Sequence, residues 1–541
     1  MTEDLAPQPP PASPPTTDVH DRPALLENAS KGRLIAVLLM IAVFSEVVPF
    51  QYSMAGVITP LVAVSFPSAG DSVSWMVTII GLVGGGTMAL LARMADQWGK
   101  KRMLVIAGVL FLIGSLVCAV TTNWPVFLAG RACQATALGM AALGYSLVRD
   151  IMPRAWIPIS IGFIGTGLGL SAVLGPLIGG ILTDHFSWRS IFWFLTVYMA
   201  VSLVLFLRFV PESDQRSRRR LDFVGALLIG FGLAAILLYV TQGESWGWTE
   251  PSCYGYLLAG IGSLLLYAIW QSRITDPIMD LSLLRVPRVF LIMAMSFVGT
   301  AVLAVLAFLP AYMFLVDGHQ VQQAIIGGAA QKAHVPPEAM AKAITFQGDI
   351  SFAQGYSLLE AAVRIILFMS VTAMIFGPLG GLWIRRSNTR HARSSAGSPL
   401  IASAVLFLVA SAGLVVWHDT WQSQALFGTI YGMAYGLFYA GLPNLVIDTV
   451  TQENQAISAG MTAVFGAIGS SFGIAIATAI LVQHPFQFAI KTRTGQEIIN
   501  KVPHLYTNGG FGQAYLYVGV GGSVIALLIA LALWSTRPAA R

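Results

Sequence analysis

The chain has 541 residues, of which 56% are hydrophobic and only 10% are charged. A soluble globular domain carries about 25% charged residues, so the composition excludes a soluble protein. The net charge of +6 can indicate a nucleic-acid partner, but the bases gather in short connectors between long apolar runs. That pattern is typical of a membrane protein, and we expect no nucleic-acid binding.

The first 32 residues are rich in Pro, Ala, Ser and Thr. A secretory signal needs a basic start followed by an apolar core, and this segment has neither, so residues 1–32 are predicted to be a disordered cytoplasmic tail. The three cysteines, Cys118, Cys133 and Cys253, offer neither a disulfide framework nor metal-ligand spacing. We expect no metal site.

Long apolar runs follow the tail. A membrane-spanning helix needs ~20 mainly apolar residues, and these runs are continuous rather than alternating, which excludes a membrane β-barrel. The sequence predicts an all-α polytopic membrane protein with fourteen transmembrane helices, at residues 34–58, 74–92, 103–121, 125–149, 157–182, 189–210, 221–242, 253–272, 289–316, 356–384, 399–417, 422–446, 458–484 and 511–535.

The basic residues divide unevenly between alternate connectors. They are dense on the side of the N-terminus, as in residues 100–102 and 216–220, and sparse on the other side. Because cytoplasmic loops are enriched in Lys and Arg, we expect both termini, including residues 536–541, to be cytoplasmic and the membrane to be the inner (plasma) membrane.

Glu46 lies near the middle of the first span, three residues before Pro49. An ionised carboxylate inside the membrane is costly unless it is paired, protonated or in contact with water. We expect Glu46 to face a central cavity, as a proton carrier or a cation-attracting group. The alternative is a structural partner buried against a base or a polar group. Pro49 is expected to kink the helix and free a carbonyl.

Three further groups of residues stand out along the chain. An acid and a glycine sit beside bases in the second connector, an arginine and a glutamine lie inside the fourth span, and the fifth span has a Gly-Pro-x-x-Gly-Gly run. These residues are Asp96, Gly99, Lys100, Lys101 and Arg102; Arg131 and Gln134; and Gly175, Pro176, Gly179 and Gly180. Taken alone, the basic connector could simply set the orientation, and the glycines could simply allow close helix packing.

Together, these groups resemble motifs A, B and C of the major facilitator superfamily, in the right order and on the right spans. Fourteen spans point to the subgroup called drug:proton antiporter family two. The sequence departs from the usual motifs at a few positions, namely Ala92, Met94, Gln97, Ala135 and Ser171. Glu46 is a plausible replacement for the Asp that relatives carry in this span, not a matched residue.

The resemblance implies two six-helix bundles, at residues 33–210 and 289–535, joined by a linker of residues 211–288 with two extra helices. It also implies a substrate site between the bundles near the middle of the membrane. Motif A would latch the cytoplasmic gate through Asp96, and the following bases would contact anionic lipid heads. Arg131 with Gln134 would tune proton transfer, and motif C would seal the cavity against proton leak.

Other polar residues are weaker candidates. Glu360 and Arg364 stand one turn apart and are expected to form an ion pair, either structural or as an outer-gate latch. Two long outer segments, 317–355 and 485–510, are expected to be solvated loops or a cap that shapes the exit path or docks an extracytoplasmic partner. Candidates for lining the cavity are Gln51, Tyr145, Tyr312, Tyr435 and Asn444.

The function implied by the resemblance is proton-coupled export of hydrophobic or amphipathic small molecules by alternating access. The protein would act as a monomer without a cofactor, in contact with membrane lipids. The alternative is export of a native lipid, siderophore or metabolite, with the insertion 317–355 guiding exit. An enzyme is disfavoured because the sequence lacks HExxH, nucleophile-elbow and phosphate-loop motifs.

Overall fold

The fold is taken from a computed structural model, which describes residues 25–55, 58, 62, 65, 66, 75–213, 222–274, 281–314, 316–388, 397–450, 452–491 and 497–535. Most of the predicted cytoplasmic tail, residues 1–24, and the predicted cytoplasmic end, residues 536–541, lie outside the described residues.

In the described part of the chain, every predicted span coincides with a helix or a run of consecutive helical segments. The first six spans correspond to α1 (Lys31–Ser45) with α2 (Val47–Ala55); α4 (Trp75–Trp98); α5 (Lys100–Val120); α6 (Trp124–Ala135), η3 (Thr136–Gly139) and α7 (Met140–Ile151); α8 (Ile157–His185), preceded by the turn η4 (Arg154–Trp156); and α9 (Arg189–Phe209).

The remaining spans follow the same rule. They correspond to α10 (Phe223–Trp246); α11 (Pro251–Gln271); α12 (Pro287–Phe314), preceded by η5 (Leu281–Arg285); α15 (Leu358–Ala361), η6 (Ala362–Ile366) and α16 (Leu367–Asn388); α17 (Gly397–Val416); α18 (Trp421–Thr449); α19 (Gln452–Val482); and α20 (Asn508–Ala514), η7 (Tyr515–Val520) and α21 (Gly521–Ser535). Within the described residues, 11 helices are long and apolar enough to cross a membrane. The protein is a multi-pass membrane protein.

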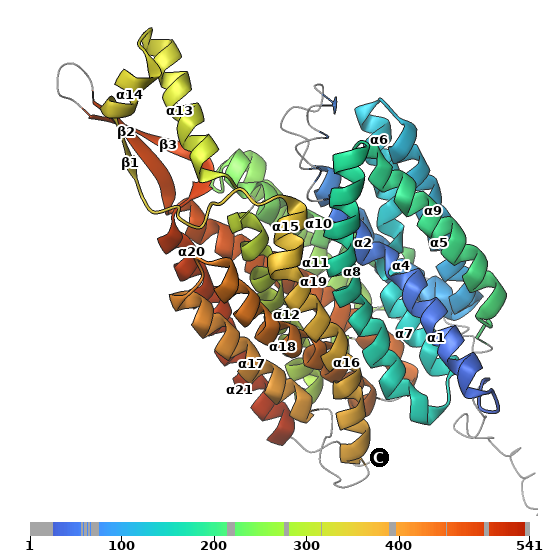
Figure 1. Ribbon diagram of the computed structural model, residues 1–541. Coiled ribbons are helices and arrows are strands. Elements are labelled where there is room, and N and C mark those ends of the chain that lie inside the picture. The colour runs from blue at the N-terminus through green and yellow to red at the C-terminus, as the bar shows by residue number, and fades with distance from the viewer. Residues whose placement is uncertain are drawn as a thin grey trace, which may run out of the picture.

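The helices form two groups that stand side by side, α1 to α9 and α12 to α21 (Figure 1). Each group has its own hydrophobic core, one built from residues between Leu26 and Val210 and the other from residues between Ala226 and Leu533. Many apolar side chains on the outside of the groups are exposed, for example Leu227 at 73% and Leu528 at 62%. Such a surface suits lipid rather than water.

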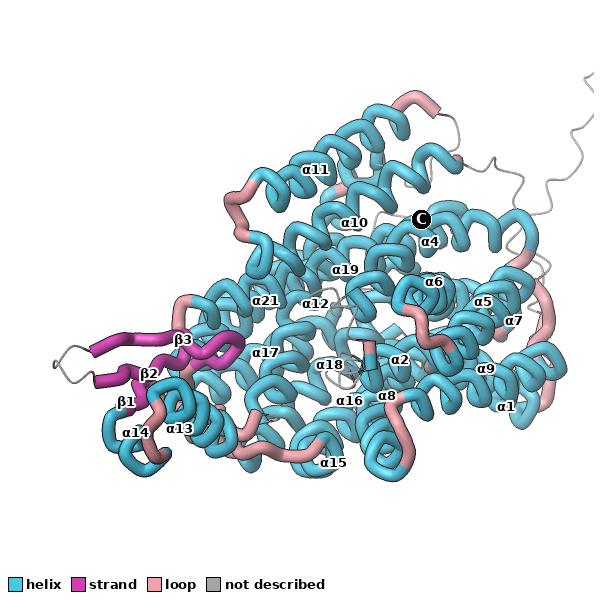
Figure 2. Tube along the Cα trace, turned by 90° about the horizontal axis from the view of Figure 1, so that it is seen from above, coloured by secondary structure: helices cyan, strands magenta, loops and turns pink. Residues whose placement is uncertain are grey.

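The helix pair α10 and α11 lies at the side of the molecule, next to α4 and α19 (Figure 2). α10 contacts both α4 of the first group and α19 of the second. The contact with α4 is close, since a Cβ added at Gly81 would stand 2.9 Å from the Leu237 side chain. Buried side chains of the pair, such as Ala226 and Tyr267, belong to the core of the second group.

The two groups meet mainly where α8 packs against α16 and α18. The contact of α8 with the tenth span runs along most of α8. Near one end, a Cβ added at Gly162 would stand 2.9 Å from the Gly377 carbonyl oxygen of α16. Near the other end, a Cβ added at Gly180 would stand 3.7 Å from the Leu359 backbone nitrogen of α15, which is an ordinary contact. Small residues thus let the two backbones approach closely.

The two long outer segments fold together into one small α/β unit, which we call the cap. It consists of α13 (Gly318–Ala333), α14 (Pro337–Ala343), β1 (Ile344–Gln347), β2 (Pro485–Lys491) and β3 (Glu497–Tyr506). The strands form an antiparallel sheet in the order β1-β2-β3, with Phe346 opposite Phe488. The insertion is therefore not confined to residues 317–355, and its segments are not simple solvated loops.

The cap has a small apolar core and a fixed base. Ala330, Met340 and Ile344 pack together beneath the sheet, and the Asn508 N–H donates to the Asp349 carbonyl at 2.8 Å. Seen from above, the cap projects sideways beyond α17 and α21 (Figure 2). It marks the end of the molecule opposite motif A, and we call the two ends the cap end and the motif A end.

Candidate functional site

Glu46 stands at a junction in the first span. α1 ends at Ser45 and α2 begins at Val47, with Glu46 between them as a turn. The Val43 carbonyl near this junction accepts a hydrogen bond from the Tyr198 hydroxyl at 2.6 Å. Pro49 follows within the first turn of α2 and cannot donate to the carbonyl four residues earlier. The backbone stays helical through this junction, since the Glu46 N–H donates to the Ala42 carbonyl at 3.0 Å and the Phe50 N–H donates to the Glu46 carbonyl at 3.1 Å. The kink expected at Pro49 therefore stays a prediction.

The Glu46 carboxyl group is 4% exposed and hydrogen-bonds the Ser171 side chain on α8. Its second oxygen, Oε2, has no hydrogen-bond partner among the described residues. The hydroxyls of Tyr145 on α7 and Tyr435 on α18 are near enough to interact electrostatically with this carboxyl group. Glu46 therefore faces polar groups from both halves of the molecule.

Three tyrosines at four-residue spacing lie along α18, and the middle one, Tyr435, is the one near Glu46. The Tyr431 hydroxyl donates instead to the Leu303 carbonyl at 2.9 Å. The ring centroids of Tyr431 and Tyr435 are 6.1 Å apart, and those of Tyr435 and Tyr439 are 4.8 Å apart. Tyr145 of the first half lies within electrostatic range of Tyr439. An acid beside several aromatic rings is an environment that attracts organic cations.

The predicted lining residues have different environments. Tyr145 and Tyr435 are half-buried and lie together near Glu46. Gln51 is completely buried, with no partner for either atom of its amide among the described residues. The Asn444 amide is turned to its own helix and donates to the Ala440 carbonyl at 2.8 Å. The side chain of Tyr312, in α12, lies outside the described residues.

Arg131 is completely buried in a network of its own within the first half. Its Nε donates to the Met76 carbonyl at 2.8 Å, and one terminal nitrogen donates to the Gln134 amide oxygen at 2.7 Å. Gln134 in turn donates to the Ser115 hydroxyl at 2.7 Å. The guanidinium also lies 5.7 Å from the centre of the Phe192 ring. The hydrogen bonds of Arg131 and Glu46 thus go to different partners.

Motif C packs α8 against α2. Gly175 faces Ser53 so closely that a Cβ at this position would collide with the serine side chain. The Ser53 hydroxyl donates to the Ser171 carbonyl at 3.2 Å. A Cβ at Gly179 would stand 3.5 Å from Met54. The side chain of Pro176 lies outside the described residues, and α8 continues through it as one helix of 29 residues.

At the motif A end, Gly99 makes the tight turn between α4 and α5. Its φ of 115° lies in the region that only glycine adopts easily. Asp96 is half-buried, within electrostatic range of Arg149 on α7. Asp96 thus lies near a base of the fourth span, and its role as a latch stays a prediction.

Two bases of motif A, Lys100 and Lys101, contact other parts of the protein. Lys100 forms a salt bridge with Asp150, and the two side chains are 6% and 3% exposed. The Lys101 ammonium donates to the Leu207 carbonyl at the end of α9, at 3.0 Å. Our expectation that Lys100 contacts anionic lipid is wrong, because its ammonium group is buried against Asp150, an acid 50 residues later in the chain.

Sequence reasoning missed the residues that complete this network. The Glu212 carboxylate accepts hydrogen bonds from the backbone N–H groups of Lys101 and Arg102, at 2.9 and 3.2 Å, and so caps the N-terminus of α5. The Ser213 hydroxyl donates to Asp150 at 2.6 Å. The available signal was that Glu212 is an acid just after the sixth span, on the side rich in bases.

Glu360 and Arg364 lie at the cap end, on the helix turn that begins the tenth span. Their charged atoms are 3.7 Å apart, and both side chains are more than 40% exposed. The Ser357 N–H donates to Glu360, and the Glu360 N–H donates to Ser357, which forms a capping box. The Arg364 guanidinium lies 4.7 Å from the centre of the Tyr356 ring. These contacts fix the start of the span.

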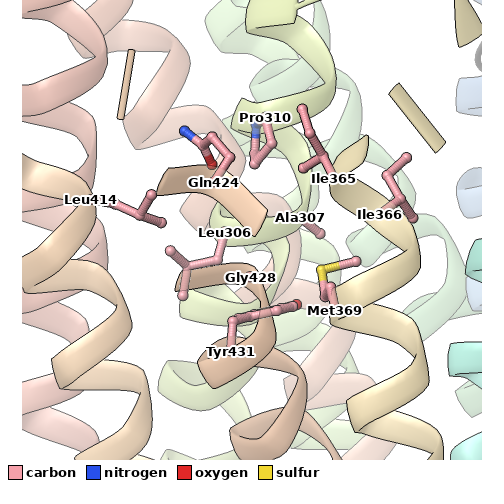
Figure 3. A pocket seen from close by; sticks show the side chains of 10 residues that line it. All are labelled: Leu306, Ala307, Pro310, Ile365, Ile366, Met369, Leu414, Gln424, Gly428 and Tyr431. Carbon is pink, nitrogen blue, oxygen red and sulfur yellow. The ribbon is translucent and has the colours of Figure 1, made fainter. Parts of the chain in front are cut away.

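A small cavity of about 20 Å³ lies in the second half, between α12, η6, α16, α17 and α18 (Figure 3). That volume suits a single water molecule and is too small for an organic substrate. Among the described residues, no three His, Cys, Asp or Glu side chains are grouped to hold a metal ion. The cavity is lined by Leu306, Ala307, Pro310, Ile365, Ile366, Met369, Leu414, Gln424, Gly428 and Tyr431.

Known proteins share this fold. The human organic anion transporter MFSD10 (TETRAN) aligns with a TM-score of 0.59 and 14% identity, over 92% of this chain and 99% of that one. A POT family transporter, solved with 5-aminolevulinic acid, aligns with a TM-score of 0.58 and 12% identity, over 93% and 96% of the two chains. At such identities the likeness concerns the fold alone.

Sequence relatives agree with the fold. The uncharacterized MFS-type transporter YvkA of Bacillus subtilis (strain 168) is 31% identical over 264 residues, which cover 48% of this chain. The chain spans 57% of YvkA and 56% of MT1926, an uncharacterized MFS-type transporter of Mycobacterium tuberculosis (strain CDC 1551 / Oshkosh). Multidrug resistance protein Stp of the same strain is 25% identical over 433 residues, 79% of this chain and 72% of Stp.

A family model described as Major Facilitator Superfamily matches residues 39–333, which is more than half of the chain. The chain therefore belongs to the major facilitator superfamily, a family of membrane transporters and not of enzymes.

Proposed function

We propose that the protein is a proton-coupled exporter of hydrophobic or amphipathic small molecules, of the fourteen-helix drug:proton antiporter type. Similarity to Stp, which is named a multidrug resistance protein, supports the export of drug-like compounds. Residues that resemble motifs A, B and C support antiport. We also propose that both termini are cytoplasmic and that the protein works as a monomer in the plasma membrane.

The observation that carries this proposal is the position of Glu46. Its carboxyl group lies at the junction of α1 and α2, bonds Ser171 beside motif C, and faces tyrosines of both halves. As a carboxylate it accepts a hydrogen bond from the Ser171 hydroxyl, and as a neutral acid it can donate one instead. Adding or removing a proton therefore alters the contact between the first span and α8.

Such a change is transmitted to the interface between the two halves. α8 packs against α16 and α18, so a shift of α8 at Ser171 moves the surface on which the second half rests. Proton uptake at Glu46 would favour one arrangement of the halves, and proton release would favour the other. An amphipathic cation attracted to the Glu46 carboxylate would compete with the proton, which is the basis of antiport.

The remaining motif residues have supporting roles in this mechanism. Arg131 with Gln134 holds the end of α4 against α6 through the Met76 carbonyl. Gly175 and Gly179 keep α2 close to α8, which would leave little room for water beside Glu46. Asp96, Gly99, Lys100 and Lys101 would latch the cytoplasmic gate.

The test is transport by Glu46→Gln in proteoliposomes. A pH gradient is imposed, and the uptake of cationic dyes is measured for wild type and variant, together with counterflow at equal pH. Proton-driven transport should be lost while counterflow remains, because glutamine keeps the shape but cannot carry a proton. Glu360→Gln, which changes an exposed acid, should behave like wild type. Normal gradient-driven transport by Glu46→Gln would refute the proposal.

One observation favours a second candidate function, export of a native lipid, siderophore or metabolite. Segments from two distant parts of the chain build the cap, which extends from the cap end of the second half and projects sideways beyond it (Figures 1 and 2). Such a cap would guide exit or dock an extracytoplasmic partner. Replacing residues 319–346 with a short linker separates the candidates, because dye efflux should survive and partner-dependent export should fail.

A further inference from the structure

His418 occupies the turn between α17 and α18 at the cap end. Its side chain is only 7% exposed. The turn itself is fixed, since the Gln424 side chain donates to the His418 carbonyl at 2.9 Å. Gln424 also donates to the Tyr515 hydroxyl at 3.3 Å, and the Tyr515 ring lies beside the imidazole with 5.8 Å between ring centroids. The backbone of the turn is therefore held by α18, and the ring packs against Tyr515 of η7.

Both ring nitrogens of His418 face backbone carbonyl oxygens. Nδ1 lies 2.8 Å from the Leu414 oxygen in the last turn of α17, and Nε2 lies 3.1 Å from the Asn508 oxygen at the start of α20. A carbonyl can only accept a hydrogen bond, and a neutral imidazole has a single N–H to donate. Only the doubly protonated ring can donate to both carbonyls, and its charge suits a helix C-terminus.

The Asn508 end of this arrangement leads directly to the cap. The Asn508 N–H donates to the Asp349 carbonyl at 2.8 Å, and its side-chain amide donates to the Asp349 carboxylate at 3.2 Å. The preceding Thr507 N–H donates to the His484 carbonyl at 2.9 Å. The residues that receive the Nε2 contact thus hold the base of both cap segments.

We propose that His418 is a proton-operated clamp between the transmembrane helices and the cap. With both nitrogens protonated, the ring ties α17 to α20 and so fixes the base of the cap. After loss of one proton, one nitrogen presents a lone pair to a carbonyl oxygen, and that link is lost. The base of the cap then moves more freely. This clamp is separate from Glu46 and needs no substrate.

A test must distinguish the effect of His418 from the effects of the other titratable groups near its ring. Asp419 is its neighbour in the chain, Tyr515 packs against it, Asp349 is linked through Asn508, and His484 lies under the start of α20, close to Gly510. Histidine is the side chain that changes charge between about pH 5 and 8. His484 is therefore the group most easily confused with His418.

The experiment is hydrogen exchange by mass spectrometry on the full chain in nanodiscs at about pH 5.5 and about pH 8.5, between which a histidine side chain ordinarily changes charge. Rates are converted to protection factors, which removes the intrinsic pH dependence of exchange. Peptides covering residues 505–512 and 344–352 should be about tenfold or more better protected at the lower pH, as expected for one charge-assisted hydrogen bond. A peptide inside α5 should not change.

Three variants decide the assignment. His418→Gln should lose the pH dependence and show the lower protection at both values. His418→Arg, which stays charged, should also lose the pH dependence but should show the higher protection at both pH values. This variant still tests the clamp if His418→Gln fails to fold. His484→Gln should behave like wild type. The proposal is overturned if wild type shows no pH dependence, if the His418 variants retain it, or if His484→Gln removes it.

Discussion

Replacing Lys100 with methionine removes one partner of a buried ion pair at the motif A end. Lys100 and Asp150 form a salt bridge with side chains 6% and 3% exposed. Methionine keeps the length and the apolar stem of lysine but not its charge. The variant leaves the Asp150 carboxylate buried, with the Ser213 hydroxyl at 2.6 Å as its remaining hydrogen-bond donor among the described contacts.

The expected loss of stability follows from burial. Removing one partner of a buried pair costs about 3–5 kcal/mol, because the other charge is left uncompensated. Arg149 lies within electrostatic range of Asp150 and offsets part of this cost, so we expect about 3 kcal/mol. For a unit of about 150–250 residues, such as the first half, each kcal/mol shifts the unfolding temperature by about 2–4 °C. The variant should therefore unfold about 6–12 °C lower.

The assay is thermal unfolding of the detergent-solubilised protein, followed by tryptophan fluorescence. Lys101→Met is the matched control, since it removes a neighbouring lysine whose ammonium makes one hydrogen bond, to the Leu207 carbonyl. It should cost about 1 kcal/mol or less. Adding Asp150→Asn to Lys100→Met should restore much of the loss, because no buried charge is then left without a partner.

Two results would refute this reasoning. If Lys100→Met and Lys101→Met lower the unfolding temperature equally, burial of the pair does not set its energy. If Asp150→Asn makes the Lys100→Met variant still less stable, the cost does not come from an uncompensated carboxylate. Either result would return Lys100 to a role at the membrane surface.

Three other substitutions test the site. Glu212→Gln removes the charge that caps α5 and should lower stability by about 1 kcal/mol in the same assay; equal unfolding temperatures would contradict the capping role. Gly175→Ala should collide with Ser53 and cost about 1–3 kcal/mol, whereas Gly180→Ala, whose Cβ would make only ordinary contacts, should be nearly neutral. Asp96→Asn should slow turnover without changing dye affinity, and a change in affinity alone would exclude its role as a latch.

The helices were predictable because apolar length is a property of each segment by itself. Every predicted span corresponds to helix in the described part of the chain, and the junction between α1 and α2 lies close to Pro49. The position of a single charged residue was less predictable. Lys100 stands in a run of bases, which suggests exposure, but its partner Asp150 becomes its neighbour only when α5 and α7 pack together.

The cap was not predictable for a related reason. β1 and β2 lie about 140 residues apart. Each alternates apolar and polar residues over a short stretch, as in Ile344-Thr345-Phe346-Gln347, but alternation does not say which distant strand is the partner. Their pairing depends on the positions of α12 and α19, which bring the two outer segments together. The contacts of His418 were likewise not predictable, because the sequence does not show that Asn508 lies next to this histidine in the folded chain. Contacts between residues so far apart in the sequence can be identified only from the folded structure.

The two segments of the cap depend on each other unequally. β2 and β3 pair with each other and can satisfy one another's backbone groups as a hairpin, whereas β1 pairs only with β2. A strand without a neighbour would leave its N–H and C=O groups unpaired. Removal of the hairpin would therefore leave β1 without a partner strand, whereas removal of β1 would leave the ladder between β2 and β3 intact. The segment with α13, α14 and β1 thus depends on the hairpin for its place in the cap.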